Sequence, residues 1–382
     1  MRRIYLDNAA TTAVSPAVAE AMLPYFTQVY GNASSIHGPG REAKRAIEAA
    51  RRQISKALNA AVPQEIYFTA GGSESDNWAI KGIAFQNGSG HIITTAIEHH
   101  AVLHTCQWLE NRGFEVTYLP VDEYGRVTAA QVEAALRPDT ILVSVMAANN
   151  EVGTVQPIGD IGALCREKGV LFHTDAVQAV GAVPIDVQAM HIDLLSMSGH
   201  KLHGPKGVGA LYIRKGVKID NLIHGGAQER GFRAGTENVP GIVGLGKAVE
   251  LSHADLADNA ARMTALREQL IHGLMARVPG TRLNGHPTER LPNNANLSFD
   301  GVEGEALLLR LDLVGVAGSS GSACTSGTLD PSHVLMALGL TPAEANGALR
   351  LTLGTDTTEE EIAAVLDVLP PIVADLRRMT RR

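Results

Sequence analysis

The chain has 382 residues, of which 45% are hydrophobic and only 4% aromatic, and its 33 basic and 40 acidic side chains give a net charge of −7. At roughly 150 residues per domain, this length predicts about two domains with a large buried core. The charge is spread along the sequence without a basic tail, which argues against nucleic acid or an anionic membrane as a partner.

The first residues contain charges but no apolar stretch after them, so we expect no secretory signal. No uninterrupted apolar run reaches the roughly 18 residues that a membrane span needs. We therefore expect a cytoplasmic protein. The three cysteines, Cys106, Cys165 and Cys324, lie far apart, with no C-x-x-C pair to indicate a zinc site or a disulfide framework.

Helical patterns alternate with short apolar runs from about residue 40 to 215. The runs that we interpret as strands are 65–70, 91–95, 140–147, 170–174, 193–197 and 207–213. This alternation predicts an α/β domain whose mostly parallel sheet is buried on both faces. Such sheets bind ligands at the carboxyl ends of their strands.

A long helical pattern follows from about 241 to 278. A mixed segment comes next, with a strand near 294–299 and a closing helix from 358 to about 379. We interpret this segment as a second, smaller α+β domain. The predicted boundaries are 15–255 for the large domain, and 1–14 together with 256–382 for the small domain.

The first motif that carries chemistry is the sequence Gly71-Gly72-Ser73-Glu74-Ser75. It follows a predicted strand and opens a helical pattern. The free N–H groups and the positive dipole end of a helix N-terminus suit an anion such as a phosphate. Many α/β proteins use such turns only structurally, so the motif gains weight from the residues that accompany it.

Two further predicted strands end in polar side chains. Asp175 ends the run that begins at 170, and alone it would be interpreted as a turn residue or a helix N-cap. The next run leads to Lys201, which is followed by a Gly-rich stretch at 204–209 that permits tight backbone geometry. Both side chains are therefore expected at the same edge of the sheet.

A carboxylate, a lysine and a phosphate cradle together are what pyridoxal 5'-phosphate (PLP) requires. The lysine forms a Schiff base, and the acid keeps the pyridine nitrogen protonated so that the ring accepts electrons. P-loop, dinucleotide-binding and H-E-x-x-H motifs are absent. A class I aldolase would also use a Schiff-base lysine, but it would not need the aspartate and the phosphate loop. The sequence thus predicts a PLP enzyme of amino-acid chemistry.

Cys324 indicates which kind of PLP enzyme this is. Cys106 and Cys165 lie in helical patterns and are interpreted as buried small hydrophobic residues. Cys324 is instead surrounded by Gly, Ser and Thr at 318–327, with nothing apolar to bury its thiol. We therefore predict that Cys324 is a nucleophile. An unperturbed thiol is only a few per cent thiolate at pH 7, so it needs local help to attack.

With these residues identified, the chain resembles the cysteine desulfurases of the nitrogen-fixation and iron–sulfur-cluster type, in the aminotransferase class V group. The likeness runs from 5–12 to 357–362, which is essentially the whole chain. It rests on the motifs HTDAVQ at 173–178, SGHK at 198–201, RAGTEN at 233–238 and SSGSACTS at 319–326. The loop at about 318–332 resembles the long-loop subgroup. The resemblance implies PLP fold type I, with a mostly parallel seven-stranded sheet in the large domain.

The resemblance also implies roles for matching residues. Lys201 would hold the cofactor and move protons once freed, Asp175 would pair with the pyridinium nitrogen, and His99 would stack on the ring and take part in proton transfer. Gln178 would contact the ring hydroxyl. The residues implied to bind the phosphate group are Gly72, Ser73, Ser198 and His200. Gly199 and Thr236 are also implied to bind the cofactor.

Two of these positions have further implications. Thr236 would reach the phosphate of a neighbouring subunit, which implies a homodimer with shared sites. Relatives often have Thr where this chain has Ser73, and the retained hydroxyl predicts no loss of binding.

Asn150 would contact both cofactor and substrate. Arg350 would hold the substrate through a bidentate pair with its carboxylate.

The implied reaction removes sulfur from L-cysteine, giving L-alanine and a persulfide on Cys324. The sulfur would pass to an iron–sulfur scaffold or another acceptor protein for cluster assembly. No stable metal site is implied, although Cys324 would be able to ligate a transient iron–sulfur cluster.

Several alternatives stay open from the sequence. Within the same fold they are a selenocysteine lyase, a cysteine-sulfinate desulfinase or an aminotransferase, the last of which should need no Cys324. A non-catalytic sulfur-relay or scaffold subunit is the alternative from another class. The retention of Lys201 and Asp175 argues against it.

Overall fold

A computed structural model describes residues 3–320 and 331–380 of the chain. Cys324 and most of its predicted loop lie outside these ranges. No helix within them combines the length and the apolar character that crossing a membrane requires.

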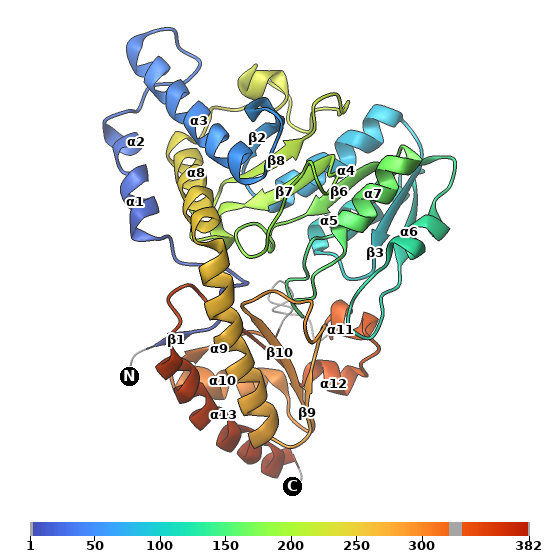
Figure 1. The fold of residues 1–382 in the computed structure, drawn as a ribbon, viewed down its shortest axis with the longest axis vertical. Coiled ribbons are helices and arrows are strands. Elements are labelled where there is room, and N and C mark those ends of the chain that lie inside the picture. Colours follow the sequence, from blue (N-terminus) through green and yellow to red (C-terminus); the bar gives the residue numbers. More distant parts are fainter. Residues whose placement is uncertain (1–2, 321–330, 381–382) are drawn as a thin grey trace.

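The large domain is built on a seven-stranded sheet (Figure 1). Its strands lie in the order β2-β8-β7-β6-β5-β3-β4, and β8 alone runs antiparallel to its neighbours. Their bounds are β2 (Ile66–Thr69), β3 (His91–Thr95), β4 (Glu115–Leu119), β5 (Thr140–Ser144), β6 (Leu171–Asp175), β7 (Leu194–Ser198) and β8 (Gly209–Ile213). The predicted α/β class and the mostly parallel sheet are confirmed. Strand β4 was not among the predicted runs, because it is an edge strand whose residues are only partly buried.

Successive residues of a central strand enter different cores, because side chains alternate across a sheet. In β3, Ile92 packs in a cluster with α4 (Gly72–Asn87) and α5 (His100–Glu110), whereas Ile93 packs in a cluster with helices of the opposite face. The helices of that opposite face are α3 (Gly38–Ala57), α7 (Ile158–Lys168) and α8 (Val239–Ala254). The sheet is therefore buried on both faces, as expected.

The predicted buried cysteines are found in these cores. Cys106 in α5 and Cys165 in α7 are both fully buried. Burial raises the pKa of each thiol above its usual value, to about 12 for Cys165. Both thiols are thus held in the unreactive protonated form.

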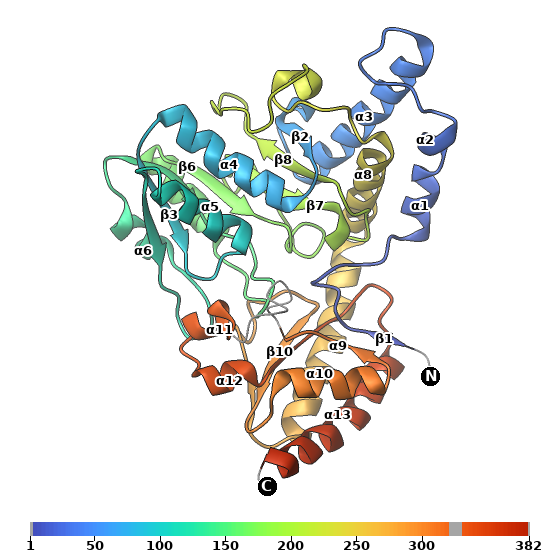
Figure 2. The same ribbon diagram turned by 180° about the vertical axis from the view of Figure 1, so that it is seen from behind.

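The sequence predicted one long helical stretch at 241–278, but the structure has two helices there. Helix α8 ends at Ala254 and α9 (Leu256–Arg277) begins after Asp255, whose backbone leaves the helical conformation. Helix α9 then leads into the smaller domain (Figures 1 and 2).

That domain has an antiparallel sheet in the order β12-β10-β9. Its bounds are β9 (Thr281–Leu283), β10 (Asn294–Phe299) and β12 (Ala348–Thr352). The helices packed with this sheet are α9, α10 (Gly304–Leu313) and α13 (Glu359–Thr380). The expected strand at 294–299 and the closing helix are confirmed, while the domain boundaries stay predictions.

The N-terminal strand of the chain belongs to the smaller domain. Strand β1 (Ile4–Tyr5) pairs in parallel with β11 (Val316–Ala317), and Asp7 forms an isolated bridge with Thr352 of β12. After β1 the chain crosses to the large domain, where α1 (Pro16–Met22) and α2 (Pro24–Thr27) follow. The crossing segment therefore passes between the two domains. The remaining α-helices of the described residues are short: α6 (Ala129–Ala135) lies between β4 and β5 in the chain, and α11 (His333–Ala337) and α12 (Pro342–Asn346) precede β12.

Candidate active site

A cavity of about 410 Å³ lies where the carboxyl ends of the large-domain strands face β12 and α11. Ten residues selected from the sequence line it: Gly72, Ser73, His99, Asn150, Asp175, Gln178, Ser198, His200, Lys201 and Arg350. Two others do not, since Gly199 is buried outside the cavity lining and Thr236 is exposed elsewhere on the chain. Cys324 lies outside the described residues.

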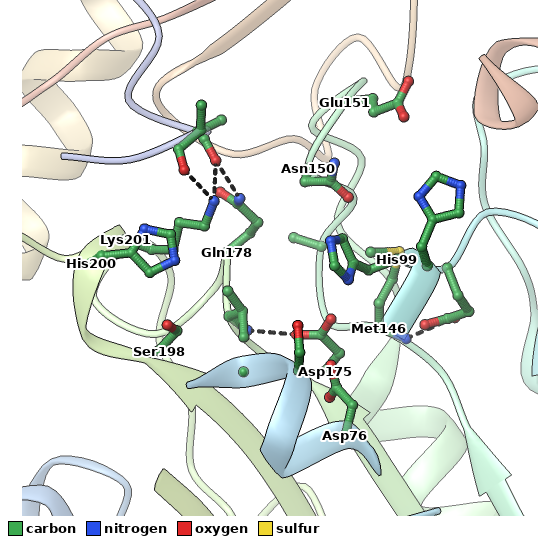
Figure 3. A pocket seen from close by; sticks show the side chains of 18 of the residues that line it. Asp76, His99, Met146, Asn150, Glu151, Asp175, Gln178, Ser198, His200 and Lys201 are labelled. Carbon is green, nitrogen blue, oxygen red and sulfur yellow. Dashed lines mark hydrogen bonds between the residues drawn. The ribbon is translucent and has the colours of Figure 1, made fainter. Parts of the chain in front are cut away.

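The Lys201 amine is held by backbone carbonyls of the crossing segment. Lys201 ends a single 3₁₀ turn, η2 (Gly199–Lys201), directly after β7. Its Nζ donates hydrogen bonds to the carbonyl oxygens of Ala9 at 2.6 Å and Ala10 at 2.8 Å. The Nε2 of Gln178 donates to the same Ala9 oxygen at 3.0 Å, so both side chains point to one place in Figure 3. The N-terminal segment is thus part of the site, which the sequence did not indicate.

Asp175 supplies a buried carboxyl at the end of β6. Its Oδ1 accepts a hydrogen bond from the Val177 N–H at 2.9 Å. Burial raises the pKa of Asp175 to about 6, and the nearby Lys201 charge offsets only part of this effect. A cation beside Asp175 would remove the penalty, and the protonated ring nitrogen of PLP is such a cation.

Asp76, which sequence reasoning missed, lies beside Asp175 (Figure 3). Burial, followed by the charge of Asp175, raises the pKa of Asp76 well above its usual value. Its Oδ1 has no hydrogen-bond partner among the described residues. In the described part of the chain, Asp76, His99 and Asp175 are the one set of three or more His, Cys, Asp or Glu side chains whose possible metal-binding atoms all lie within 4.8 Å of one another.

The first turn of α4 provides an anion cradle. A Cβ atom on Gly72 would lie only 2.6 Å from a methyl carbon of Val177, so a glycine is needed for this close packing. A second hollow of about 450 Å³ continues from here and is lined by Gly72, Ser73, Ser198, His200 and others. Helix N–H groups and two serine hydroxyls fit a phosphate group. With Asp175 and Lys201, this donor set fits PLP as a whole.

His99 is both the N-cap of α5 and a wall of the cavity. Its Nδ1 accepts a hydrogen bond from the Ala101 N–H at 3.1 Å, which assigns the ring proton to Nε2. Burial lowers the pKa of His99 to about 4, and the charge of Lys201 adds to this effect. The ring is therefore a neutral, flat imidazole at neutral pH, as stacking on a cofactor ring requires.

Arg350, on β12 of the smaller domain, lines the cavity opposite the carboxyl ends of the large-domain strands. Its Nη1 donates to the Asn150 carbonyl oxygen and its Nη2 to Asp7 Oδ1, each at 3.0 Å. Its side chain is only 2% exposed. The sequence indicated Arg350 and Asn150 but not Asp7, because nothing in the local pattern pairs residues 343 positions apart.

Glu98 is a further residue that sequence reasoning missed. It accepts hydrogen bonds from Thr95 Oγ1 at 2.7 Å and the Met146 N–H at 3.0 Å. Burial raises its pKa to about 8. Its position next to His99, just after a predicted strand, was the signal that could have identified it.

Comparison with known proteins identifies the family of the chain. The model of the aminotransferase class-V family matches residues 4–365. A protein of Methanosarcina thermophila named cysteine desulfurase IscS is 58% identical over 99% of this chain and 94% of its own length. One of the same name from Clostridium botulinum is also 58% identical, over 99% of this chain and 96% of its own length.

Solved structures with a similar fold and sequence support the same family. A structure titled NifS-like protein is 42% identical, with a TM-score of 0.92, and the match covers 98% of this chain and all of that one. Another, titled SspA in complex with cysteine, is 41% identical with a TM-score of 0.83, over 93% of this chain and all of that one. The chain therefore belongs to the aminotransferase class-V family of PLP-dependent enzymes, within its cysteine desulfurases.

Proposed function

We propose that this enzyme removes sulfur from L-cysteine, releasing L-alanine and leaving a persulfide on Cys324. The observation that carries the proposal is the convergence of Lys201, Asp175 and His99 on one cavity that Arg350 faces from the other domain. The names of relatives at 58% identity support the substrate, as does a similar structure titled as a complex with cysteine. When bound, PLP supplies an electron sink for the negative charge that develops at the substrate Cα.

Three side chains of the chain prepare that step. Asp175, with its charged form penalised by burial, favours a protonated ring nitrogen beside it. Lys201 Nζ is the group that moves the Cα proton, and the carbonyls of Ala9 and Ala10 fix its position. His99 stays neutral and presents an N–H at Nε2.

Arg350 is suited to the substrate carboxylate. A guanidinium group binds a carboxylate through two parallel hydrogen bonds. The hydrogen bond from Arg350 to Asp7 would then be shared or exchanged when the substrate binds. Asn150 lies beside this position, since its carbonyl already accepts from Arg350.

Cys324 would complete the reaction as a thiolate. Its Sγ forms a bond to the substrate sulfur, while the Cβ–S bond of the substrate breaks and its electron pair stays on the carbon skeleton. Protonation of that skeleton gives alanine. The Gly, Ser and Thr residues around Cys324 support this role from the sequence.

The destination of the sulfur and the assembly state belong to the same proposal. Relatives named IscS support delivery to an iron–sulfur scaffold or another acceptor protein, with Cys324 as ligand to a transient cluster. Thr236 is exposed and does not line its own cavity, which suits a residue that serves a partner subunit of a homodimer. The expected cytoplasmic location is also part of the proposal.

Incubation of the purified protein with L-cysteine tests the reaction directly. We expect alanine in the solution and a mass increase of one sulfur atom on the Cys324 peptide. When a thiol reductant is added, it should reduce the persulfide and release this sulfur as sulfide. The exchange Cys324→Ser should abolish both sulfur products and leave the visible absorption of the cofactor, whereas Lys201→Ala should shift that absorption. Unchanged turnover of cysteine by Cys324→Ser would contradict the proposal and favour an aminotransferase. Rates on selenocysteine and cysteine sulfinate separate the two lyase alternatives.

A further inference from the structure

Three histidines form a cluster at the wall of the cavity, next to the residues that we assign to the reaction. His100 and His104 lie on α5, four positions apart, with ring centroids 4.9 Å apart. His333, the first residue of α11, has its ring centroid 4.8 Å from that of His100. None of the three has a role in the reaction proposed above.

The spacing of the first two is that of a metal-binding pair. Residues four apart on a helix lie one above the other on the same face, and two histidines placed this way can bind one ion. A third imidazole from another element then gives three nitrogen ligands. Zn²⁺ and similar ions accept such a set, with water in the fourth position.

The hydrogen bond of His333 provides an independent observation. Its Nε2 lies 3.0 Å from the carbonyl oxygen of Glu98. A carbonyl can only accept, so the Nε2 carries the proton and the Nδ1 keeps its lone pair. Metal-binding histidines characteristically fix their second nitrogen in this way, through a backbone carbonyl or a carboxylate.

We propose that His100, His104 and His333 form a binding site for a divalent transition-metal ion of the Zn²⁺ or Co²⁺ type. The site is separate from the group of Asp76, His99 and Asp175, and it does not require Cys324. It joins a helix that covers the large sheet to the helix that follows the segment carrying Cys324. An ion here would fix the start of α11 and occupy the wall of the cavity, because His100 and His333 both line it.

Binding requires one adjustment. The ligand atoms of the three rings do not all lie within 4.8 Å of one another. The His104 side chain is exposed and makes no hydrogen bond within the described part of the chain, so it can turn towards the other two.

Titration of the holoenzyme with Co²⁺, in the absence of cysteine, tests the site. Trp108 lies one helical turn beyond His104 on α5, so a bound paramagnetic ion should quench its fluorescence. We expect saturation at one equivalent per chain. The exchanges His104→Ala and His333→Asn should each weaken Co²⁺ binding by at least about tenfold, because each removes one of three ligands.

Two controls make the result specific. His272→Ala removes a histidine that is 76% exposed on α9, and it should leave the titration unchanged. Cys324→Ser should also bind Co²⁺ normally. Quenching of equal affinity in His104→Ala, or its loss in Cys324→Ser or His272→Ala, would overturn the proposed site.

Discussion

The exchange Asp175→Asn should stabilise the cofactor-free protein while it inactivates the enzyme. The asparagine has the same shape and can still accept the hydrogen bond from the Val177 N–H through its Oδ1. It removes only the buried charge. In the holoenzyme the same change removes the partner of the ring nitrogen, so we expect kcat to fall by at least about 100-fold.

The size of the stability effect follows from the pKa of Asp175. Burial raises this pKa from 3.8 to about 6, which corresponds to a penalty of about 3 kcal/mol on the charged form. The folded state therefore holds the proton more tightly than the unfolded state. The contribution of Asp175 to stability falls as the pH rises from 3.8 to about 6, and it is constant above that.

Thermal unfolding of the cofactor-free proteins between pH 5 and 7.5 measures this effect. Between pH 5 and 7.5, the free energy of unfolding of Asp175→Asn should rise relative to that of the parent protein by about 1 kcal/mol, most of it below about pH 6.5. For a chain of this length, the change corresponds to about 2 °C in Tm. Asp367→Asn, which removes a carboxylate that is 76% exposed, should show no such step.

Two results would refute this reasoning. One is a difference between Asp175→Asn and the parent that does not change with pH. The other is a cofactor-free Asp175→Asn protein that is less stable than the parent at pH 7.5. In either case burial would not be penalising the carboxylate, and Asp175 would not need a cation beside it.

Three other exchanges probe the cradle, the core and the substrate position. Gly72→Ala places a methyl group 2.6 Å from a valine methyl carbon, so PLP affinity in absorbance titrations should fall by at least about tenfold; Gly38→Ala, with nothing within 4 Å, should bind normally. Glu229→Ala removes the buried carboxylate partner of the Arg51 guanidinium, which keeps only the partly exposed Glu48 as an ion-pair partner, and it should lower stability in urea unfolding by about 3–5 kcal/mol; an added Arg51→Met exchange should recover most of the loss, and no recovery would contradict a charge effect. Arg350→Leu should raise the KM for L-cysteine by at least about 30-fold with a smaller change in kcat, and an unchanged KM would remove Arg350 from the substrate site.

The parts of the fold that could be predicted are those in which local sequence and burial agree. Central strands such as β8, with the sequence GALYI, are short, mainly apolar and buried at every residue, so they show no alternation and are easily recognised. Edge strand β4 has the mixed sequence EVTYL, because one side of it faces solvent. The pairing of β1 with β11 joins segments more than 300 residues apart, which no local pattern encodes.

The same distinction applies to the site. Lys201 and Asp175 follow predicted strands, and parallel strands bring their carboxyl ends to one edge, so their proximity could be inferred. Asp76 lies in an ordinary helical sequence and gains its properties only from burial beside Asp175. Asp7 contacts its partner Arg350 because the N-terminal strand β1 pairs with β11 of the smaller domain.

The buried carboxyls link cofactor binding to folding. Asp175, Asp76 and Glu98 are all held where burial opposes their charge, so the large domain carries an energetic cost at this edge of its sheet. The packed clusters on both faces of the sheet offset that cost. A ligand with a protonated ring nitrogen would pair with the Asp175 carboxylate, and its phosphate would accept hydrogen bonds from the free N–H groups at the start of α4. Because such a ligand binds only the folded chain, its affinity must include the relief of this penalty, and pH changes that neutralise Asp175 must weaken its binding.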